Sequence, residues 1–370
     1  MIRWGRLARL ARFAGLGFAG AVALAAGTVC LGTGCSTLGY YAQSVNGHLD
    51  MVASARPVAD WVADDQTPAA LKERLALSQR LRDYASSELA LPDNASYRRY
   101  ADLKRGAAVW NVVAAPELGL TLKTWCFPVV GCVGYRGYFD RVDAERFAAE
   151  LMPQALEVNV YGVPAYSTLG KLPFDFLADP LLNTFINYAE GELARLIFHE
   201  LAHQVAYAQD DTVFNESFAV AVERIGGARW LAAPQRAAAA EEYQRHDSRR
   251  SDFRALTQAY RDRLAMLYKS DQADEAKRAA KAALMAEMRA EHVRIRAERW
   301  GGFTGYDHWF ARANNASFGV LSAYNELVPA FEQLFERQGR DFPRFYAEVK
   351  RLAALPKDQR RAALRAASGD

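Results

Sequence analysis

The chain has 370 residues, of which 51% are hydrophobic and 24% charged, and its formal net charge is +3. This composition is typical of a globular protein, and the length predicts one large domain or two interlocked ones. The slight excess of basic residues does not indicate a nucleic-acid-binding protein. Beyond the N-terminal segment the sequence has no cluster of lysine and arginine with interleaved aromatic residues.

The first 34 residues have the pattern of an export signal. Four arginines between residues 3 and 12 precede an apolar run over residues 13–31, and small residues then precede Cys35. The pattern resembles a bacterial lipoprotein signal. That resemblance implies cleavage before Cys35, a lipid anchor on it, and a periplasm-facing lipoprotein, with Ser36 favouring the outer membrane. Gly32 stands where the usual motif has leucine, so a simple secretory signal or an uncleaved anchor is the alternative.

The mature part, residues 35–370, begins with expected helices and strands over residues 36–190. After a tether, short helices are expected around residues 45–52 and 58–62, and a longer one over 69–91. Alternating apolar residues predict strands over residues 107–114, 120–127, 133–139 and 157–163, and a short edge strand over 165–168, with a helix at 143–151. An exposed edge strand of such a mixed sheet can hold an extended peptide.

Only two cysteines remain beyond the signal region, Cys126 and Cys132, and they flank a short turn that contains proline and glycine. In an oxidising compartment such a pair predicts a disulfide. Two free buried thiols are the alternative, whereas a zinc ribbon would need four ligands.

The segment His199-Glu200-Leu201-Ala202-His203 carries the most specific chemical signal of the chain. On a helix, here expected over residues 192–208, two histidines four residues apart face the same side and can bind one Zn²⁺. Glu200 then projects beside the metal, where it can act as the general base on a bound water. We therefore expect one zinc ion per chain. An ordinary amphipathic helix with two incidental histidines is the alternative.

A second helix is expected over residues 213–225, capped by Asp211 or Thr212 and ended by two glycines at 226–227. A tight turn joins it to the first helix, so the two helices should pack antiparallel. Glu216 and Glu223 then lie on one face, near the level of the histidines, and either could supply the third ligand that a catalytic zinc site needs.

The second helix resembles the Asn-Glu-Gly-Phe-Ala…Glu element of aminopeptidase-N-like gluzincins. Asn215, Glu216, Phe218, Ala219 and Glu223 match it, and position 217 departs from it, with serine in place of glycine. The resemblance implies that Glu216 is the third metal ligand, with Glu223 and Asn215 supporting the ligands. Glu216 follows the second histidine sooner than in that family, and Glu223 falls near the usual spacing, so the reverse assignment stays open.

Residues 228–370 predict a helical C-terminal part. Long helices are expected over 232–298, followed by a glycine-rich break at 301–305 and helices over 306–321 and 324–352. The last of these should be interrupted between residues 339 and 343, and a polar tail is expected from residue 356. Hydrolysis produces an oxyanion that needs a donor. Tyr306 and His308 are the candidates after the break, and Tyr135, Tyr138 and Tyr166 are the alternatives in the sheet.

A wider resemblance covers nearly the whole mature chain. Segments 38–43, 126–128, 135–139, 163–170 and 199–204 are similar to a family of bacterial lipoproteins described as putative or predicted aminopeptidases. The resemblance implies an α+β, mainly α fold, with a gluzincin-like zinc-peptidase core, a mixed sheet before the zinc helices (191–227), and a helical C-terminal half. Its implied activity is zinc-dependent hydrolysis of a peptide substrate.

The mode of that hydrolysis stays open. The sequence lacks the Gly-x-Met-Glu-Asn strand with which aminopeptidase-N relatives bind the substrate amine. An endopeptidase or a hydrolase of cell-wall peptides is therefore an alternative. A non-catalytic envelope lipoprotein that binds peptides or partners through a peptidase fold is another.

Overall fold

A computed structural model describes residues 35–127, 131–168, 175–321 and 327–368 of the chain. The expected signal segment, residues 1–34, lies outside the described residues. The chain divides into two compact units, Met1–Asp50 and Met51–Asp370, and helix α2 (Cys35–Ala53) spans their boundary. Within the described ranges, none of the helices combines the length and the apolar character that a membrane span requires.

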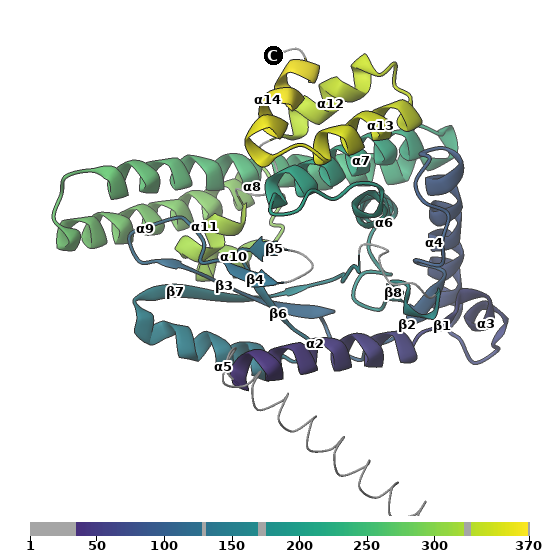
Figure 1. Ribbon diagram of the computed structural model, residues 1–370, viewed down its shortest axis with the longest axis horizontal. Helices are drawn as coiled ribbons and strands as arrows, with labels where there is room; N and C mark the ends of the chain where they lie inside the picture. The colour runs from purple at the N-terminus through teal and green to yellow at the C-terminus, as the bar shows by residue number, and fades with distance from the viewer. Residues whose placement is uncertain (1–34, 128–130, 169–174, 322–326, 369–370) are drawn as a thin grey trace, which may run out of the picture. The chain divides into compact units, whose positions relative to one another are not determined.

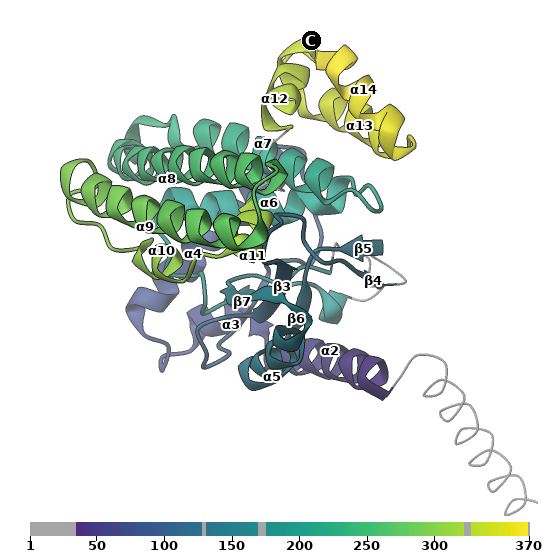
Figure 2. The ribbon, with the colours of Figure 1, turned by 90° about the vertical axis from the view of Figure 1, so that its left-hand side faces the viewer.

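The second unit is mainly helical with small sheets, as the sequence predicts for an α+β protein (Figure 1). Helices α8 and α9 form a long hairpin in which the two run side by side in both views (Figures 1 and 2). The helices are α3 (Val58–Ala63), α4 (Ala69–Ser87), α5 (Arg141–Leu151), α6 (Glu190–Val205), α7 (Thr212–Leu231), α8 (Ala237–Lys269), α9 (Asp274–Glu298), α10 (Asp307–Arg312), α11 (Asn315–Leu321), α12 (Val328–Arg337), α13 (Phe342–Ala353) and α14 (Lys357–Ser368).

Among the described residues, three small sheets accompany the helices. The largest has the order β6-β3-β7, and both of its pairs are antiparallel. A second has the order β1-β2-β8, and β4 and β5 form a hairpin. The strands are β1 (Arg56–Pro57), β2 (Arg99–Ala101), β3 (Val109–Pro116), β4 (Trp125–Phe127), β5 (Gly131–Val133), β6 (Arg136–Tyr138), β7 (Leu156–Val163) and β8 (Leu181–Leu182).

The two long strands of the sheet were predicted, and the irregular ones were not. The predicted strands over 107–114 and 157–163 correspond to β3 and β7, but the one over 120–127 is a strand only in β4. The one over 133–139 is split into the end of β5 and β6. A β-carbon at Gly134 would lie 2.8 Å from Cδ1 of Leu122, so glycine there allows the close approach at which the chain leaves one sheet for the other.

The prediction of an edge strand over residues 165–168 is wrong, because the segment has no strand structure. Thr168 donates its backbone N–H to Oδ1 of Asp179 at 2.9 Å, and its hydroxyl donates to the same oxygen. The hydroxyl of Ser167 donates to Oδ2 of Asp179. The segment is thus bound to a buried carboxylate rather than to a neighbouring strand.

Helix α7 does not end at its two glycines, contrary to the prediction, but continues to Leu231. A β-carbon at Gly226 would lie 2.6 Å from Leu89 and 3.0 Å from Phe198, so glycine lets α7 approach its neighbours closely. At this position the residue serves helix packing, which outweighs its weak helix propensity.

The C-terminal part also departs from the sequence pattern. The helix expected over 306–321 is broken into α10 and α11, because Ala313 has an extended backbone. The expected polar tail is instead helix α14, whose Leu364 is fully buried. The expected interruption near 339–343 is confirmed, since α12 ends at Arg337 and α13 begins at Phe342.

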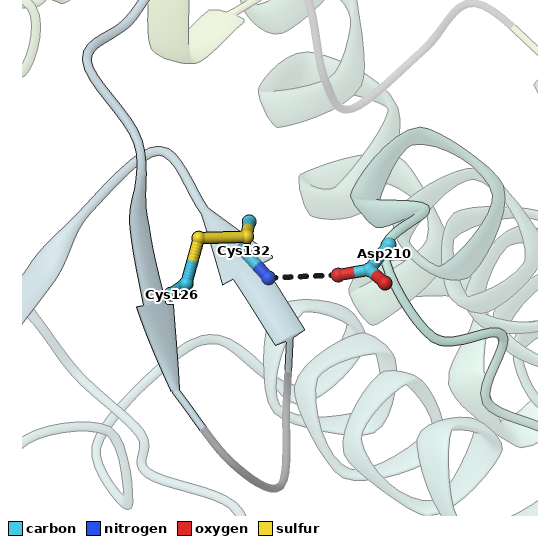
Figure 3. The surroundings of a disulfide bond; sticks show 3 residues. All are labelled: Cys126, Cys132 and Asp210. Atoms are coloured by element: carbon cyan, nitrogen blue, oxygen red, sulfur yellow. Dashed lines mark hydrogen bonds between the residues drawn. A yellow bond between two sulfur atoms is a disulfide. The ribbon is translucent and has the colours of Figure 1, made fainter.

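The β4–β5 hairpin is joined by a disulfide between Cys126 and Cys132 (Figure 3). The backbone N–H of Cys132 donates to Oδ1 of Asp210, in the turn between α6 and α7, at 2.8 Å. Gly131 has a φ of +76°, and a β-carbon there would collide with the same carboxylate. The hairpin is therefore attached to the turn between the two helices that carry the candidate site.

Replacing both cysteines by serine should lower the free energy of unfolding by about 2 kcal/mol, because the short cross-linked loop gains freedom in the unfolded chain. Chemical denaturation with and without a reductant measures the effect. The reductant should destabilise the parent protein by the same amount and leave the Cys126→Ser/Cys132→Ser variant unchanged. Equal stability of the two oxidised proteins would contradict the expectation.

Candidate metal centre

Helix α6 is buried along most of its length. Leu193, Ile197, Phe198 and Leu201 have no exposed surface and belong to the main core. The two acidic residues of its first turn, Glu190 and Glu192, lie at the positive end of the helix dipole. The helix begins two residues before and ends three residues before the predicted bounds of 192–208. Its burial holds the imidazoles of the motif in a fixed orientation.

The turn between α6 and α7 is fixed by side-chain hydrogen bonds. Asp211 caps α7 by accepting from the N–H of Phe214, as one of the two predicted caps. Asn215 is buried and binds the backbone of Ala208 twice, accepting from its N–H at 2.7 Å and donating to its carbonyl at 2.8 Å. These bonds set the register of α7 against α6.

Three side chains converge at one point between the two helices. The Nε2 atoms of His199 and His203 are 3.1 Å apart, and Oε2 of Glu216 lies 3.3 Å from the first and 3.8 Å from the second. These residues form a group whose ligand atoms could hold a metal ion. A tetrahedral zinc ion with bonds of 2.0–2.1 Å has ligand atoms about 3.3 Å apart, so the arrangement fits the ion.

The donor set also fits zinc by its chemistry. Two imidazole nitrogens and one carboxylate oxygen make the three-ligand set of catalytic zinc sites, which leaves a fourth position open. The side chains of His199 and Glu216 are 14% and 18% exposed, so neither is completely shielded from solvent.

Glu223 binds the opposite side of His199. Its Oε2 lies 3.0 Å from Nδ1 of that ring, the nitrogen that faces away from His203 and Glu216. The carboxylate therefore cannot share the point where the three candidate ligand atoms meet. Its position is that of an acceptor that holds the ring and makes it a better donor.

Charged side chains behind Glu223 form a chain that leads out to α8. Arg195 forms an ion pair with Glu223 and lies 3.6 Å from Glu192. Glu192 in turn accepts two hydrogen bonds from Arg250 of α8, at 2.9 and 3.0 Å. Sequence reasoning missed Arg195, although it stands four residues before His199 on a helix that is otherwise apolar there.

The electrostatics of the two imidazoles differ. Burial alone would lower the pKa of each ring. At His199 the hydrogen bonds and negative charges of Glu216 and Glu223 outweigh burial and raise the pKa well above its ordinary value. At His203 burial prevails and lowers the pKa to about 4. The opposite shifts are expected because two protons cannot occupy the short gap between the facing Nε2 atoms.

The two carboxylates remain ionised despite burial. Burial opposes their charge, but His203 and His199 lower the pKa of Glu216, and Arg195 and His199 lower that of Glu223. Glu216 thus presents an ionised carboxylate to the point where the three candidate ligand atoms meet.

Glu200 differs from its acidic neighbours. Burial raises its pKa to about 7, and the negative charges of Glu216 and Asp179 add to the effect although His199 opposes it. Gln204, one turn later on the same face of α6, binds the side chains of Asn94 and Ser96. Glu200 therefore faces the loop that precedes β2.

Tyrosines near the centre, one buried and two half-buried, were also missed by sequence reasoning. Burial, with a smaller contribution from the charge of Glu216, raises the pKa of Tyr161 to about 12, although a hydrogen bond with Asn111 opposes the shift. Burial and then Glu216 likewise raise the pKa of Tyr207. The hydroxyl of Tyr97 is buried without a hydrogen-bond partner in the described structure, and Glu200 contributes to its raised pKa. The alternation of β7 could have indicated Tyr161, but not which face it takes.

The structure does not bring the predicted oxyanion donors to the centre. Tyr306 is stacked on Phe253 of α8, with ring centroids 4.4 Å apart, inside the second hydrophobic cluster. His308 is exposed and lines a cavity to which none of the three candidate ligands contributes. Their helix is held there by its packing on α9.

The alternative tyrosines and Asn215 also have other neighbours. Tyr138 packs on Phe147 of α5, Tyr166 packs on Phe139, and Tyr135 is 40% exposed. The hydrogen bonds described for Asn215 join it to the backbone of Ala208, so it acts on the ligands only through the position of α7.

One comparison with known protein families gives a match over most of the chain. The family model described as putative aminopeptidase matches residues 39–364, and the chain belongs to that family. Membership supports a peptidase-like function. No curated protein and no solved structure matches the chain.

The two glutamates of α7 should contribute differently to metal binding. Replacing Glu216 by glutamine should weaken zinc binding by more than 100-fold, since a ligand is lost, and replacing Glu223 should weaken it about 10- to 100-fold, since only the support of His199 is lost. Competition with a chromophoric chelator measures both. Glu332→Gln, the same change at a surface carboxylate, is the control. A larger effect at Glu223 than at Glu216 would assign the ligand to Glu223.

Asp179 should make stability depend on pH. Burial raises its pKa to about 6, although its hydrogen bonds to Thr168 and Ser167 oppose the shift. The folded state therefore holds the proton more tightly, and this stabilisation, about 3 kcal/mol, is present below pH 4 and is lost as the pH rises through 6.

Between pH 4 and pH 7 the free energy of unfolding should thus fall by about 2 kcal/mol more in the parent protein than in Asp179→Asn. Urea denaturation at both pH values provides the measurement. Parallel pH profiles for the two proteins would show that the carboxyl keeps its ordinary pKa.

Proposed function

We propose that the protein is a zinc-dependent peptidase of the gluzincin type. His199, His203 and Glu216 are the metal ligands, and Glu200 is the general base. The observation that carries the proposal is the convergence of two Nε2 atoms and one carboxylate oxygen at spacings that match a tetrahedral zinc ion. Glu223 on the far side of His199 supports it, because a ring that is held this way is typical of metal ligands.

The chemistry follows from the positions of these groups. Zinc bound here would make water a nucleophile near neutral pH and polarise the scissile carbonyl. Glu200 accepts a proton from the attacking water at a carboxylate oxygen. It then delivers that proton to the amine nitrogen as the carbon–nitrogen bond breaks. The water oxygen forms the new bond to the carbonyl carbon.

The oxyanion donor is better sought near Glu216 than on α10. Burial and the charge of Glu216 raise the pKa of both Tyr161 and Tyr207, whereas Tyr306 is stacked on Phe253. His308 lines the same cavity as Tyr161 but is exposed. We propose that the hydroxyl of Tyr161 or Tyr207 donates to the developing oxyanion.

The lipid anchor on Cys35 and the periplasmic location belong to the same proposal. Their support is the sequence pattern of residues 1–35. Mass spectrometry of the protein purified from membranes should show an N-terminus at Cys35 with attached acyl chains. An N-terminus elsewhere, or an unmodified cysteine, would contradict the anchor.

The Glu200→Gln variant tests the mechanism. It should bind zinc as the parent does and lose nearly all turnover, because the amide cannot accept the proton. Cleavage of a peptide library is measured beside metal content. Each peptide is supplied with a free and with an acetylated N-terminus, since an aminopeptidase needs the free amine.

Full activity of Glu200→Gln on any cleaved peptide would rule out the general-base role. One equivalent of zinc with no cleavage by the parent protein across the library would instead favour a peptide-binding protein.

A further inference from the structure

Strand β7 is an outer strand of the β6-β3-β7 sheet, and its outer edge is the feature that carries a further inference. The carbonyl of Val163 accepts from the N–H of Ala108 and so points toward β3. Along a strand, the backbone N–H and C=O groups of successive residues point to opposite sides. The backbone groups of Val158, Val160 and Gly162 therefore point away from β3.

Only one end of this outer edge is occupied by described groups. Asn314, between α10 and α11, donates from its side chain to the carbonyl of Val158 at 3.0 Å. For Val160 and Gly162 the described structure contains no backbone partner on that side. Unpaired strand edges of this kind accept an extended chain as an additional strand.

A cavity of about 640 Å³ lies along this edge. Residues 158–162 of β7 line it consecutively, so the edge itself and not one face of the strand forms its wall. Helix α5 lines it with Arg141 and Ala148, and α10 lines it with His308 and Arg312. The edge thus lies in a groove between two helices, which leaves room for an extended backbone about 4.8 Å from β7.

The charges of the groove favour an acidic occupant. Its lining includes Arg141, Arg312 and His308 but only one carboxylate, Glu145. Glu145 is already bound to Nε of Arg141 at 2.7 Å, and Arg141 also lies over the ring of Trp110. Arg312 is exposed and has no ion-pair partner within the described residues. A carboxylate in the groove would meet this guanidinium.

We propose that the β7 groove binds an extended acidic peptide segment as an added strand. The backbone of Val160 and Gly162 supplies the hydrogen bonds, and Arg312 with Arg141 selects carboxylate side chains. The groove contains no residue of α6 or α7 and none of the candidate metal ligands, although Tyr161, a candidate oxyanion donor, also lines it. Binding of a peptide to the β7 edge therefore does not require the metal, and it does not depend on the proposed function.

The test uses the full chain with Glu200→Gln, which prevents cleavage of the probe. Fluorescent peptides of about six residues, acetylated and amidated at their ends, carry two glutamates or two lysines among valine and serine residues. Fluorescence anisotropy measures affinity, and amide hydrogen exchange measures protection of residues 158–162. The glutamate peptide should bind and protect this segment, and the lysine peptide should bind about tenfold more weakly or not at all.

Two matched pairs of variants locate the contact. Val160→Pro removes one outward N–H without removing a bond to β3, and Val160→Ala keeps that N–H. Arg312→Glu reverses a groove charge, and Arg337→Glu makes the same change on α12. Val160→Pro and Arg312→Glu should each weaken the glutamate peptide about tenfold, and the two controls should leave it unchanged.

Three results would overturn the proposal. One is that no peptide of the set binds, and another is that Arg312→Glu leaves the affinity of the glutamate peptide unchanged. The third is that binding is lost when zinc is removed, which would place the peptide at the metal centre. Because Arg312 is exposed, its variant keeps the test valid even where Val160→Pro disturbs the strand.

Discussion

The packing of α6 against α7 is the constraint on which the rest of this structure depends. It brings the carboxylates of Glu216 and Glu223 to the two sides of one buried imidazole. Charges are costly to bury unless each has a partner at the correct distance. A shift of α7 by one residue would leave Glu223 without His199 and Arg195. The register of the two helices is therefore a requirement of both stability and chemistry.

The sequence predicted the parts of the site that depend on local spacing. Two histidines four residues apart must face one side of a helix, and a short turn must return the next helix alongside. These two facts placed Glu216 and Glu223 near the two histidines, but only the structure separates them by the ring nitrogen that each one meets.

Contacts between distant segments could not be predicted in this way. Asp179 reaches the region of the centre from a loop, and Tyr161 reaches it from a strand. Tertiary packing decides which way such side chains point. The sequence pattern predicts that Gly226 ends its helix. In the fold this glycine instead lets the helix pack closely against its neighbours. Strands of two or three residues have too little periodicity to detect. Tyr306 and His308 belonged to the expected helix, but the extended backbone at Ala313 and the aromatic packing of α10 decide where they lie.

Strand β7 has a part in both proposed sites. The charge of Glu216 contributes to the raised pKa of Tyr161, which also lines the groove, and the backbone of Val160 and Gly162 points away from β3 toward the groove. A change in the register of β7 would alter both.

The bonds at the α6–α7 turn also bear on the order of folding. Asp210 accepts from Cys132, which is 78 positions away, and its carbonyl accepts from Lys357, which is 147 positions away. Arg360 binds the neighbouring Asp211 across a similar interval. Contacts over such separations form slowly, because long loops must close first. We expect the two helices to acquire their final turn only after the last helix of the chain has arrived, so a nascent or truncated chain would lack a finished centre.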